Sequence, residues 1–155
     1  MNLRDRLIGI IKETDWLMRA LTAVRAAHLP DGCIGAGAIR NTVWDYLHNR
    51  TQPACPNDVD VAYYSRRDLA READRKIESL LAAMEPDLPW DGVNQAGVHL
   101  WFPAHFGYEV APLTSIVEAV ASWPETATAV AVALDDDVPY SSASRRRASA
   151  ATGVS

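Results

Sequence analysis

Asp58 and Asp60 lie in a short segment whose residue types and spacing could bind a metal ion. They alternate with Val59, Val61 and Tyr63, a pattern typical of a β-strand. Alternation places both carboxylates on one face of the strand, about 6.5–7 Å apart. Two such carboxylates repel each other unless a cation or a proton lies between them, and Mg²⁺ or Mn²⁺ prefers oxygen ligands of this kind. The segment therefore predicts a site for a divalent cation.

A glycine turn upstream could hold phosphate groups. Gly35, Ala36 and Gly37 follow a short apolar segment and precede a helical pattern, with Arg40 and Asn41 in the first helical turn. Glycine lets the backbone turn tightly and lets a ligand approach the amides. The N-terminus of a helix favours phosphate, and an arginine fork suits the same group. A phosphate site together with a carboxylate pair favours phosphoryl or nucleotidyl transfer.

Four blocks of sequence carry a resemblance to a known family. They are Gly35–Asn41, Asn57–Asp60, Asn94–Ala96 with Val98–Phe102, and Trp123–Ala129. In this order they resemble a bacterial nucleotidyltransferase-like branch of the DNA polymerase β superfamily, over about residues 29–134. The glycine turn of that superfamily is usually Gly-Ser or Gly-Gly, about a dozen residues before the carboxylates. Here it lies further upstream, and a proline-containing segment, residues 50–56, fills the gap.

The resemblance implies a fold, an activity and a third acidic residue. The fold is α/β (α+β), with a small mixed sheet packed against helices. The activity is metal-dependent transfer of a nucleoside monophosphate from an NTP to an unknown acceptor hydroxyl. Asp58 and Asp60 would hold the Mg²⁺ (or Mn²⁺) ion that carries the triphosphate, and Asp60 would share a second ion with a carboxylate from a later strand. Asp91 is the candidate for that carboxylate, with Glu85 and Asp87 as competitors.

Two other interpretations stay open. The chain could be an inactive domain of the same fold that binds a nucleotide or a partner. It could also be another Mg-dependent phosphate-transfer enzyme, such as a hydrolase or a glycosyltransferase with an Asp-x-Asp motif. A haloacid-dehalogenase interpretation is disfavoured because Val61 and Ala62 follow Asp60 where that family needs Asp-x-Thr after its nucleophile.

Several elements must position these residues. Periodicity predicts helices over 3–27, 38–48, 67–84 and 114–121, and strands over 33–35, 58–64, 90–94, 98–102 and 127–134. The buried side of the second helix is expected to be Ile39, Val43, Trp44 and Leu47. The charged residues of the helix over 67–84 are expected to form a solvated face. Residues 1–137 are predicted to form one domain, and residues 138–155 a disordered tail, since Ser, Ala and Arg dominate there.

A few polar residues near the predicted site are ambiguous. Asn94 and Gln95 could orient a ligand or satisfy backbone groups in a bend. His99 is expected to be a satisfied, partly buried histidine rather than a general base. The loop over 103–112 could flank the cleft or pack on the surface.

Composition limits the class of protein. The 155 residues are 48% hydrophobic and 23% charged, with a net charge of −5 and a pI near 5.3, as in an ordinary globular domain. The acidic balance makes extensive nucleic-acid binding unfavourable. No apolar run approaches the length of a membrane span, and residues 1–15 do not resemble a signal peptide, so a cytoplasmic protein is expected. Cys33 and Cys55 lack the spacing of a metal site and are expected to be buried thiols.

Overall fold

The computed structural model describes residues 3–35, 37–48, 58–107, 109–122, 131–135 and 138–141. Within them one mixed sheet forms, in the order β3-β2-β1-β4-β5. Its strands are β1 (Cys33–Gly35), β2 (Val59–Tyr63), β3 (Trp90–Asn94), β4 (Ala131–Asp135) and β5 (Val138–Ser141). The predicted mixed α/β fold is confirmed, as is each strand predicted over 33–35, 58–64 and 90–94.

The β2 and β3 strands form the parallel pair of the sheet. Helix α4 (Arg71–Met84) crosses between them, and β3 begins after a turn at residues 86–88. The pairs β1–β2, β1–β4 and β4–β5 are antiparallel. Because parallel strands must be joined by a crossover, α4 connects the two strands that carry the predicted carboxylates.

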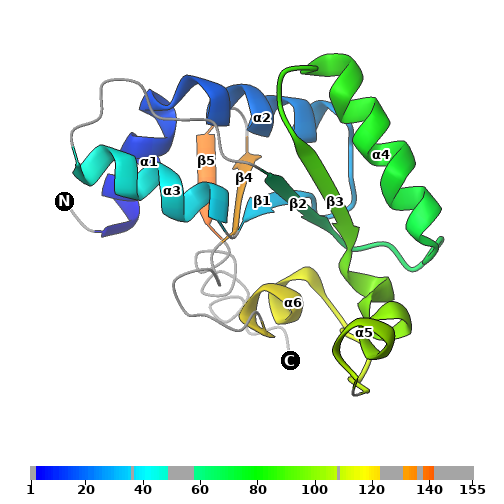
Figure 1. Ribbon diagram of the computed structural model, residues 1–155. Helices are drawn as coiled ribbons and strands as arrows, with labels where there is room; N and C mark the ends of the chain where they lie inside the picture. Colours follow the sequence, from blue (N-terminus) through cyan, green and yellow to red (C-terminus); the bar gives the residue numbers. More distant parts are fainter. Residues whose placement is uncertain are drawn as a thin grey trace.

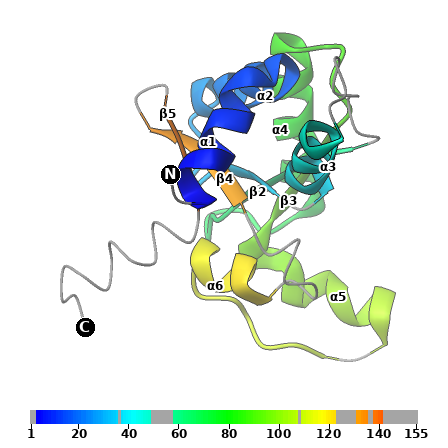
Figure 2. The ribbon, with the colours of Figure 1, turned by 90° about the vertical axis from the view of Figure 1, so that its left-hand side faces the viewer.

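Helices cover the two faces of the sheet unequally, as Figures 1 and 2 show. On one face lie α1 (Leu3–Glu13), α2 (Asp15–Ala26), α3 (Gly37–Leu47) and α4; on the other lie α5 (Val98–Phe106) and α6 (Ile116–Ser122). The larger core cluster joins Leu17, Leu21 and Val24 of α2 and Leu81 of α4 to Ile34, Val59, Val61 and Val132 of the strands. The first face therefore holds most of the buried apolar surface.

The helices and loops that the structure describes cover the second face only in part. A smaller cluster there joins Ile116 and Val120 of α6 to Cys33, Ala62, Ala131 and Ala133 of the strands. Side chains alternate along a strand, so Asp58 and Asp60 lie on the face of Ala62. On this face Asp58 is exposed and Asp60 is half-buried.

The single long helix predicted over residues 3–27 is wrong. Thr14 leaves the helical conformation (φ −96°, ψ 97°) and separates α1 from α2. Its buried hydroxyl donates to the Ile10 carbonyl at 2.8 Å, while its own carbonyl accepts from the Met18 amide at 3.1 Å. Hydrogen bonds of Thr14 satisfy the polar groups at the break. The apolar periodicity continues across it, so the sequence pattern does not indicate that the helix is interrupted.

The strand predicted over Val98–Phe102 is also wrong, because these residues begin α5. The Asn94 side chain accepts from the Ala96 amide and starts a 3₁₀ turn, η1 (Gln95–Gly97), which continues directly into the helix. Aromatic and β-branched content favoured a strand, but a local side-chain cap determined the backbone direction.

The buried side predicted for α3 is partly wrong. Ile39 is buried as expected, but Trp44 and Leu47 are 57% and 58% exposed. Thr42 and Asp45 are the other buried residues of this helix. The prediction failed because polar residues take the inward positions, and hydrophobic periodicity cannot indicate such a face.

The last two strands correct the predicted domain boundary at residue 137. β4 confirms the strand predicted over 127–134 within its described part, while residues 127–130 lie outside the described residues. β5 then pairs with β4 from Asp135↔Val138 to Val132↔Ser141. The first four residues of the predicted disordered tail are therefore a strand, and residues 142–155 lie outside the described residues.

In the part of the chain that the structure describes, no helix is long and apolar enough to cross a membrane.

Candidate active site

The register of β2 and β3 brings two of the predicted carboxylates together. Asp60 pairs with Asp91 across the parallel strands, between Val59↔Trp90 and Val61↔Gly92. Residues opposite each other in a sheet point to the same face, so both side chains lie on the partly covered face. Asp58 is exposed and immediately precedes β2. Three acidic residues thus lie near the N-terminal ends of the two parallel strands.

The glycine turn begins at the same edge. Cys33 pairs with Ala62 and Ile34 with Val61, so one further step of this antiparallel register sets Gly35 opposite Asp60. Gly37 begins α3, and Ala36 lies outside the described residues. The 20 or so residues between turn and carboxylates in the sequence therefore do not separate them in the sheet.

The two predicted phosphate-binding residues of α3, Arg40 and Asn41, are exposed in and just after its first turn. They follow the N-terminus of an eleven-residue helix that starts beside the carboxylates. Backbone amides at such an end favour anions. The sequence prediction of a phosphate site here stays a prediction, with its residues in a compatible place.

Burial and nearby like charges disfavour ionisation of Asp60 and of Asp91. Burial raises the pKa of Asp60 to about 6, and repulsion from Asp91 and Asp58 adds to the effect. Burial also raises the pKa of Asp91, with further repulsion from Glu78 and Asp58. The repulsion belongs to the group as a whole, because ionising one member makes the next harder to ionise. A divalent cation would relieve it.

The donor set fits a hard cation, although no compact cluster is formed. Within the described ranges no three His, Cys, Asp or Glu residues are gathered closely enough to hold a metal ion. Asp60 and Asp91 are nevertheless neighbours across the strands, and carboxylate oxygens are the ligands that Mg²⁺ and Mn²⁺ prefer. The pair therefore offers oxygen atoms of the kind that divalent cations take as ligands.

The two competitors for the third carboxylate lie elsewhere. Glu85 accepts a hydrogen bond from Arg19 Nη1 at 3.2 Å and ends α4. Asp87 is exposed in the turn before β3. Of the three candidates, Asp91 is the one that the register places beside Asp60.

Sequence reasoning missed a buried polar centre at the opposite end of the same strands. Asp74 of α4 is 3% exposed and accepts three hydrogen bonds. The donors are Tyr63 Oη at 2.6 Å, the Asn94 amide at 2.9 Å and Arg71 Nη1 at 2.7 Å. Burial raises the pKa of Tyr63, and the hydrogen bond to Asp74 and the charge of Asp74 raise it further.

The prediction that the charges of α4 form a solvated face is therefore wrong for Asp74. A signal was present: Asp74 lies three and seven residues before Ile77 and Leu81, on the stripe that faces the core. A carboxylate on such a stripe must find donors, because burying an unpaired charge is costly.

Asn94 satisfies backbone groups, which was one of its two predicted roles. Its Oδ1 accepts from the Ser65 and Ala96 amides at 3.0 and 3.1 Å. Its Nδ2 donates to the Ser65 and Asp68 carbonyls at 2.8 and 3.0 Å. This side chain therefore ties the end of β3 to the loop that follows β2.

The outer edge of β3 is closed by helix α4. The Gly92 amide donates to Glu78 Oε1 at 2.9 Å, and the Asn94 amide donates to Asp74. An edge strand with free amides would invite pairing with another chain. Here two carboxylates of α4 occupy those amides and hold β3, and with it Asp91, in register.

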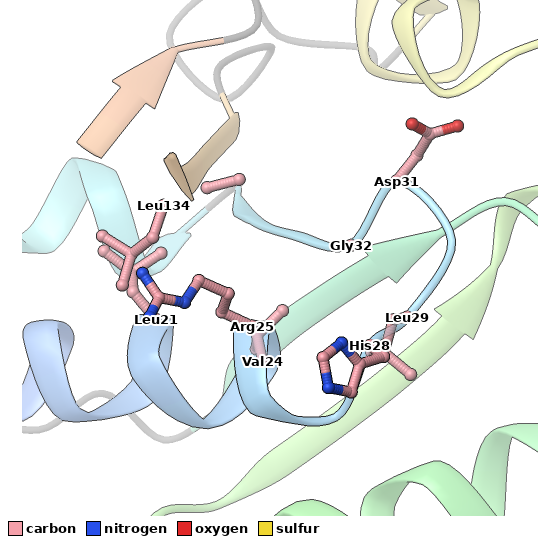
Figure 3. Close-up of a pocket in the computed structure, with 9 residues that line it drawn as sticks. Leu21, Val24, Arg25, His28, Leu29, Asp31, Gly32 and Leu134 are labelled. Atoms are coloured by element: carbon pink, nitrogen blue, oxygen red, sulfur yellow. The ribbon is translucent and has the colours of Figure 1, made fainter. Parts of the chain in front are cut away.

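A separate cavity of about 330 Å³ lies at the other end of β1 (Figure 3). Its lining comes from the end of α2, the following turn and β4: Leu21, Val24, Arg25, His28, Leu29, Asp31, Gly32, Ala133 and Leu134. His28 and Asp31 both adopt φ 53°, which is uncommon for residues other than glycine. None of the predicted site residues lines this cavity.

Carboxylates that are neighbours across two strands, beside a glycine turn that leads into a helix, are an arrangement typical of sites for phosphate groups and cations. Comparison with protein families specifies the class. Residues 22–146 match the model of a family described as nucleotidyltransferase, and the chain belongs to that family. The match continues beyond residue 137, in keeping with β5 being part of the sheet.

A solved structure shares the fold. It is described with the words "The NMR structure of the protein reveals a CCA-adding enzyme head domain". Its TM-score is 0.72 at 25% sequence identity, and the match covers 88% of this chain and 70% of that chain. Nothing among curated proteins matches the chain significantly.

Proposed function

We propose that this protein is a metal-dependent nucleotidyltransferase that moves a nucleoside monophosphate from an NTP to an acceptor hydroxyl. One observation carries the proposal: Asp60 and Asp91 are neighbours in the sheet, at the edge where the glycine turn begins, in a chain that belongs to a nucleotidyltransferase family. The raised pKa values of both carboxyls support it, since they reflect a site that gains from a cation.

Each group of site residues has its own proposed role in the reaction. Asp58, Asp60 and Asp91 would hold Mg²⁺ or Mn²⁺, which when bound neutralises phosphate charge and lowers the pKa of an attacking hydroxyl. The amides after Gly35, with Arg40 and Asn41, would orient the phosphates of the NTP. At pH 7 Asp60, with a pKa of about 6, is mostly ionised and ready to bind the cation.

Product analysis tests the reaction class. The parent protein is incubated with each α- or γ-labelled NTP, Mg²⁺ or Mn²⁺, and a cell extract as the source of acceptor. Nucleotidyl transfer releases pyrophosphate and labels an acceptor only from the α-labelled NTP. Release of orthophosphate would show a hydrolase instead, and release of neither would show a binding domain.

Matched variants tie the reaction to the site. Asp60→Asn keeps the side-chain shape and removes the charge, so turnover is expected to fall at least about 100-fold. Asp87→Asn makes the same change at an exposed turn and is expected to leave turnover within about twofold. Equal turnover in the Asp60→Asn and parent proteins would exclude Asp60 as a metal ligand.

An inactive domain of the same fold is the second candidate. Among the described residues no three possible metal ligands lie close together. A site that lacks a full set of protein ligands for a metal ion favours this second candidate. This candidate predicts NTP binding, measured by calorimetry, without pyrophosphate release under any condition of the screen.

A further inference from the structure

Positive charge is concentrated in one short part of an otherwise acidic chain. Five of its fifteen Lys and Arg residues lie within residues 66–76, while the whole chain has a net charge of −5. They are Arg66, Arg67, Arg71, Arg75 and Lys76, and all five are exposed. We call Arg66, Arg67, Arg71 and Arg75 the arginine cluster.

The same segment holds three acidic residues, Asp68, Glu72 and Asp74, so its net charge is +2. Asp74 is buried, and its Oδ2 pairs with Arg71. The Asp68 side chain accepts from the Ala70 amide. Among the residues that the structure describes, Arg66, Arg67 and Arg75 form no ion pair.

Two arginines of the cluster lie against aromatic rings. Arg66 Nε donates to Tyr64 Oη at 3.2 Å, and its guanidinium lies 5.7 Å from the centre of the Tyr64 ring. Arg71 lies 4.9 Å from the centre of the Trp101 ring of α5. Such contacts restrain the guanidinium groups and leave N–H donors for a ligand. Ordered arginine forks are well suited to phosphate oxygens.

The cluster is connected to the candidate active site by β2. Tyr64 is four residues beyond Asp60, and both belong to the partly covered face of the sheet. Four residues of strand span about 13 Å. Arg66, against Tyr64, and Arg71, against Trp101 of α5, therefore lie on the same side of the sheet as the carboxylates, toward the far end of β2, and are separate from the phosphate site proposed at Gly35–Asn41.

We propose that the arginine cluster binds the phosphate groups of the acceptor, and that the acceptor is a phosphate-bearing chain rather than a neutral molecule. This inference rests on the proposed function, which supplies the acceptor. The phosphates could belong to a single-stranded oligonucleotide, whose bases would also stack on the guanidinium planes, or to a chain without bases.

Binding measurements with two probes test the proposal. The probes are a fluorescein-labelled 15-nucleotide single-stranded RNA of mixed sequence and an inorganic polyphosphate of 15 phosphates as its competitor. Fluorescence anisotropy is followed from 50 to 200 mM KCl with EDTA present, so that binding does not depend on a metal ion. Arg66→Ala/Arg67→Ala is compared with Arg6→Ala/Lys12→Ala, which removes the same charge from exposed positions of α1.

The arginine-cluster variant is expected to bind the RNA at least tenfold more weakly than the parent at 100 mM KCl. Its log–log salt slope should fall by about 1.4, because each phosphate that an arginine neutralises on a single strand contributes about 0.7. The α1 variant should stay within twofold of the parent, and both variants should keep the parent melting temperature. Competition by polyphosphate at an equal phosphate concentration would identify phosphate alone as the recognised group, and failure to compete would identify the oligonucleotide.

The proposal is overturned if the parent binds neither probe, if the arginine-cluster variant binds like the parent, or if the α1 variant loses as much affinity. These outcomes are separable from a failure of the proposed function. RNA binding by the parent is measured in EDTA without NTP, whereas pyrophosphate release is measured with NTP and Mg²⁺ or Mn²⁺, so either can fail without the other. RNA binding without nucleotidyl transfer would therefore reject the proposed reaction and leave the binding surface in place.

Discussion

The two ends of the β2–β3 pair differ in how they treat their polar residues. At the starting end, Asp60 and Asp91 face each other across the strands, and their pKa values are raised by burial and like charge. At the far end, Tyr63 faces Asn94, and both donate to Asp74. Asp60 and Asp91, which repel each other, are thus only three residues along the strands from Tyr63 and Asn94, which both donate hydrogen bonds to Asp74.

The difference separates stability from function within a single structural unit. The far end fixes the register, since Asp74 and Asn94 link α4, β2, β3 and η1. The starting end uses that register to hold two like charges in place, which costs stability in the metal-free protein. Proteins retain charge repulsion of this kind at sites where a bound ligand relieves it. Changes at the two ends should therefore have opposite signs.

The largest effect is expected at the far end. Asp74→Ala removes the acceptor of three hydrogen bonds and leaves the buried Tyr63 hydroxyl without a partner. It should lower the free energy of unfolding by about 3 kcal/mol, measured by urea denaturation. Glu72→Ala, on the exposed side of the same helix, is the control and should change it by less than about 0.5 kcal/mol. Equal effects of the two substitutions would show that Asp74 does not hold the strands together.

Asp60→Asn should stabilise the metal-free protein. The pKa of Asp60 is about 6 in the folded protein, above its ordinary value of 3.8 in an unfolded chain. The folded state therefore binds the proton more tightly, and the parent loses stability as the pH rises from about 4 to about 6. The variant lacks this loss and should be more stable by about 1 kcal/mol above pH 7, a figure that allows for solvent screening of a half-exposed carboxyl.

Melts from pH 4 to pH 8 check this prediction. The gain in the Asp60→Asn protein should shrink as the pH falls through 6 and be small near pH 4, where the carboxyl is protonated in the folded parent and partly protonated in the unfolded chain, whose pKa is 3.8. Asp87→Asn should show no such dependence on pH. A variant that is less stable than the parent at pH 7 would place Asp60 in a structural hydrogen-bond network, like Asp74, and remove the contrast between the two ends.

The smallest effect is expected at Glu78, which lies between the two ends. Glu78→Gln keeps an oxygen that accepts from the Gly92 amide and removes a charge that raises the pKa of Asp91. Stability should change by no more than about 0.5 kcal/mol, whereas Glu78→Ala should cost about 1 kcal/mol by leaving the amide without its acceptor. Chemical denaturation of both variants distinguishes the acceptor role from the charge.

Local patterns predicted the starting end better than the far end. The period-two alternation around Asp58 and Asp60 and the Gly-x-Gly turn are signals within a few residues, and they predicted strand β2 and the start of helix α3, while the role of the carboxylates stays a prediction. The hydrogen-bond donors to Asp74 come from β2, β3 and α4, and no local sequence pattern predicts that these three elements come together. The same limit explains α5, where the side chain of Asn94 overrode the strand preference of the residues after it.

Thermal unfolding of the parent and the Asp60→Asn protein, with and without Mn²⁺ at fixed ionic strength and with NTP present, tests the central claim most directly. If the starting end of β2–β3 is a metal site, Mn²⁺ at ten times its dissociation constant should stabilise the parent by about 1.4 kcal/mol. The Asp60→Asn protein, which cannot supply the charge, should lose most of this response. A parent that shows no response to Mn²⁺ in the presence of NTP, or a variant that responds equally, would contradict the account.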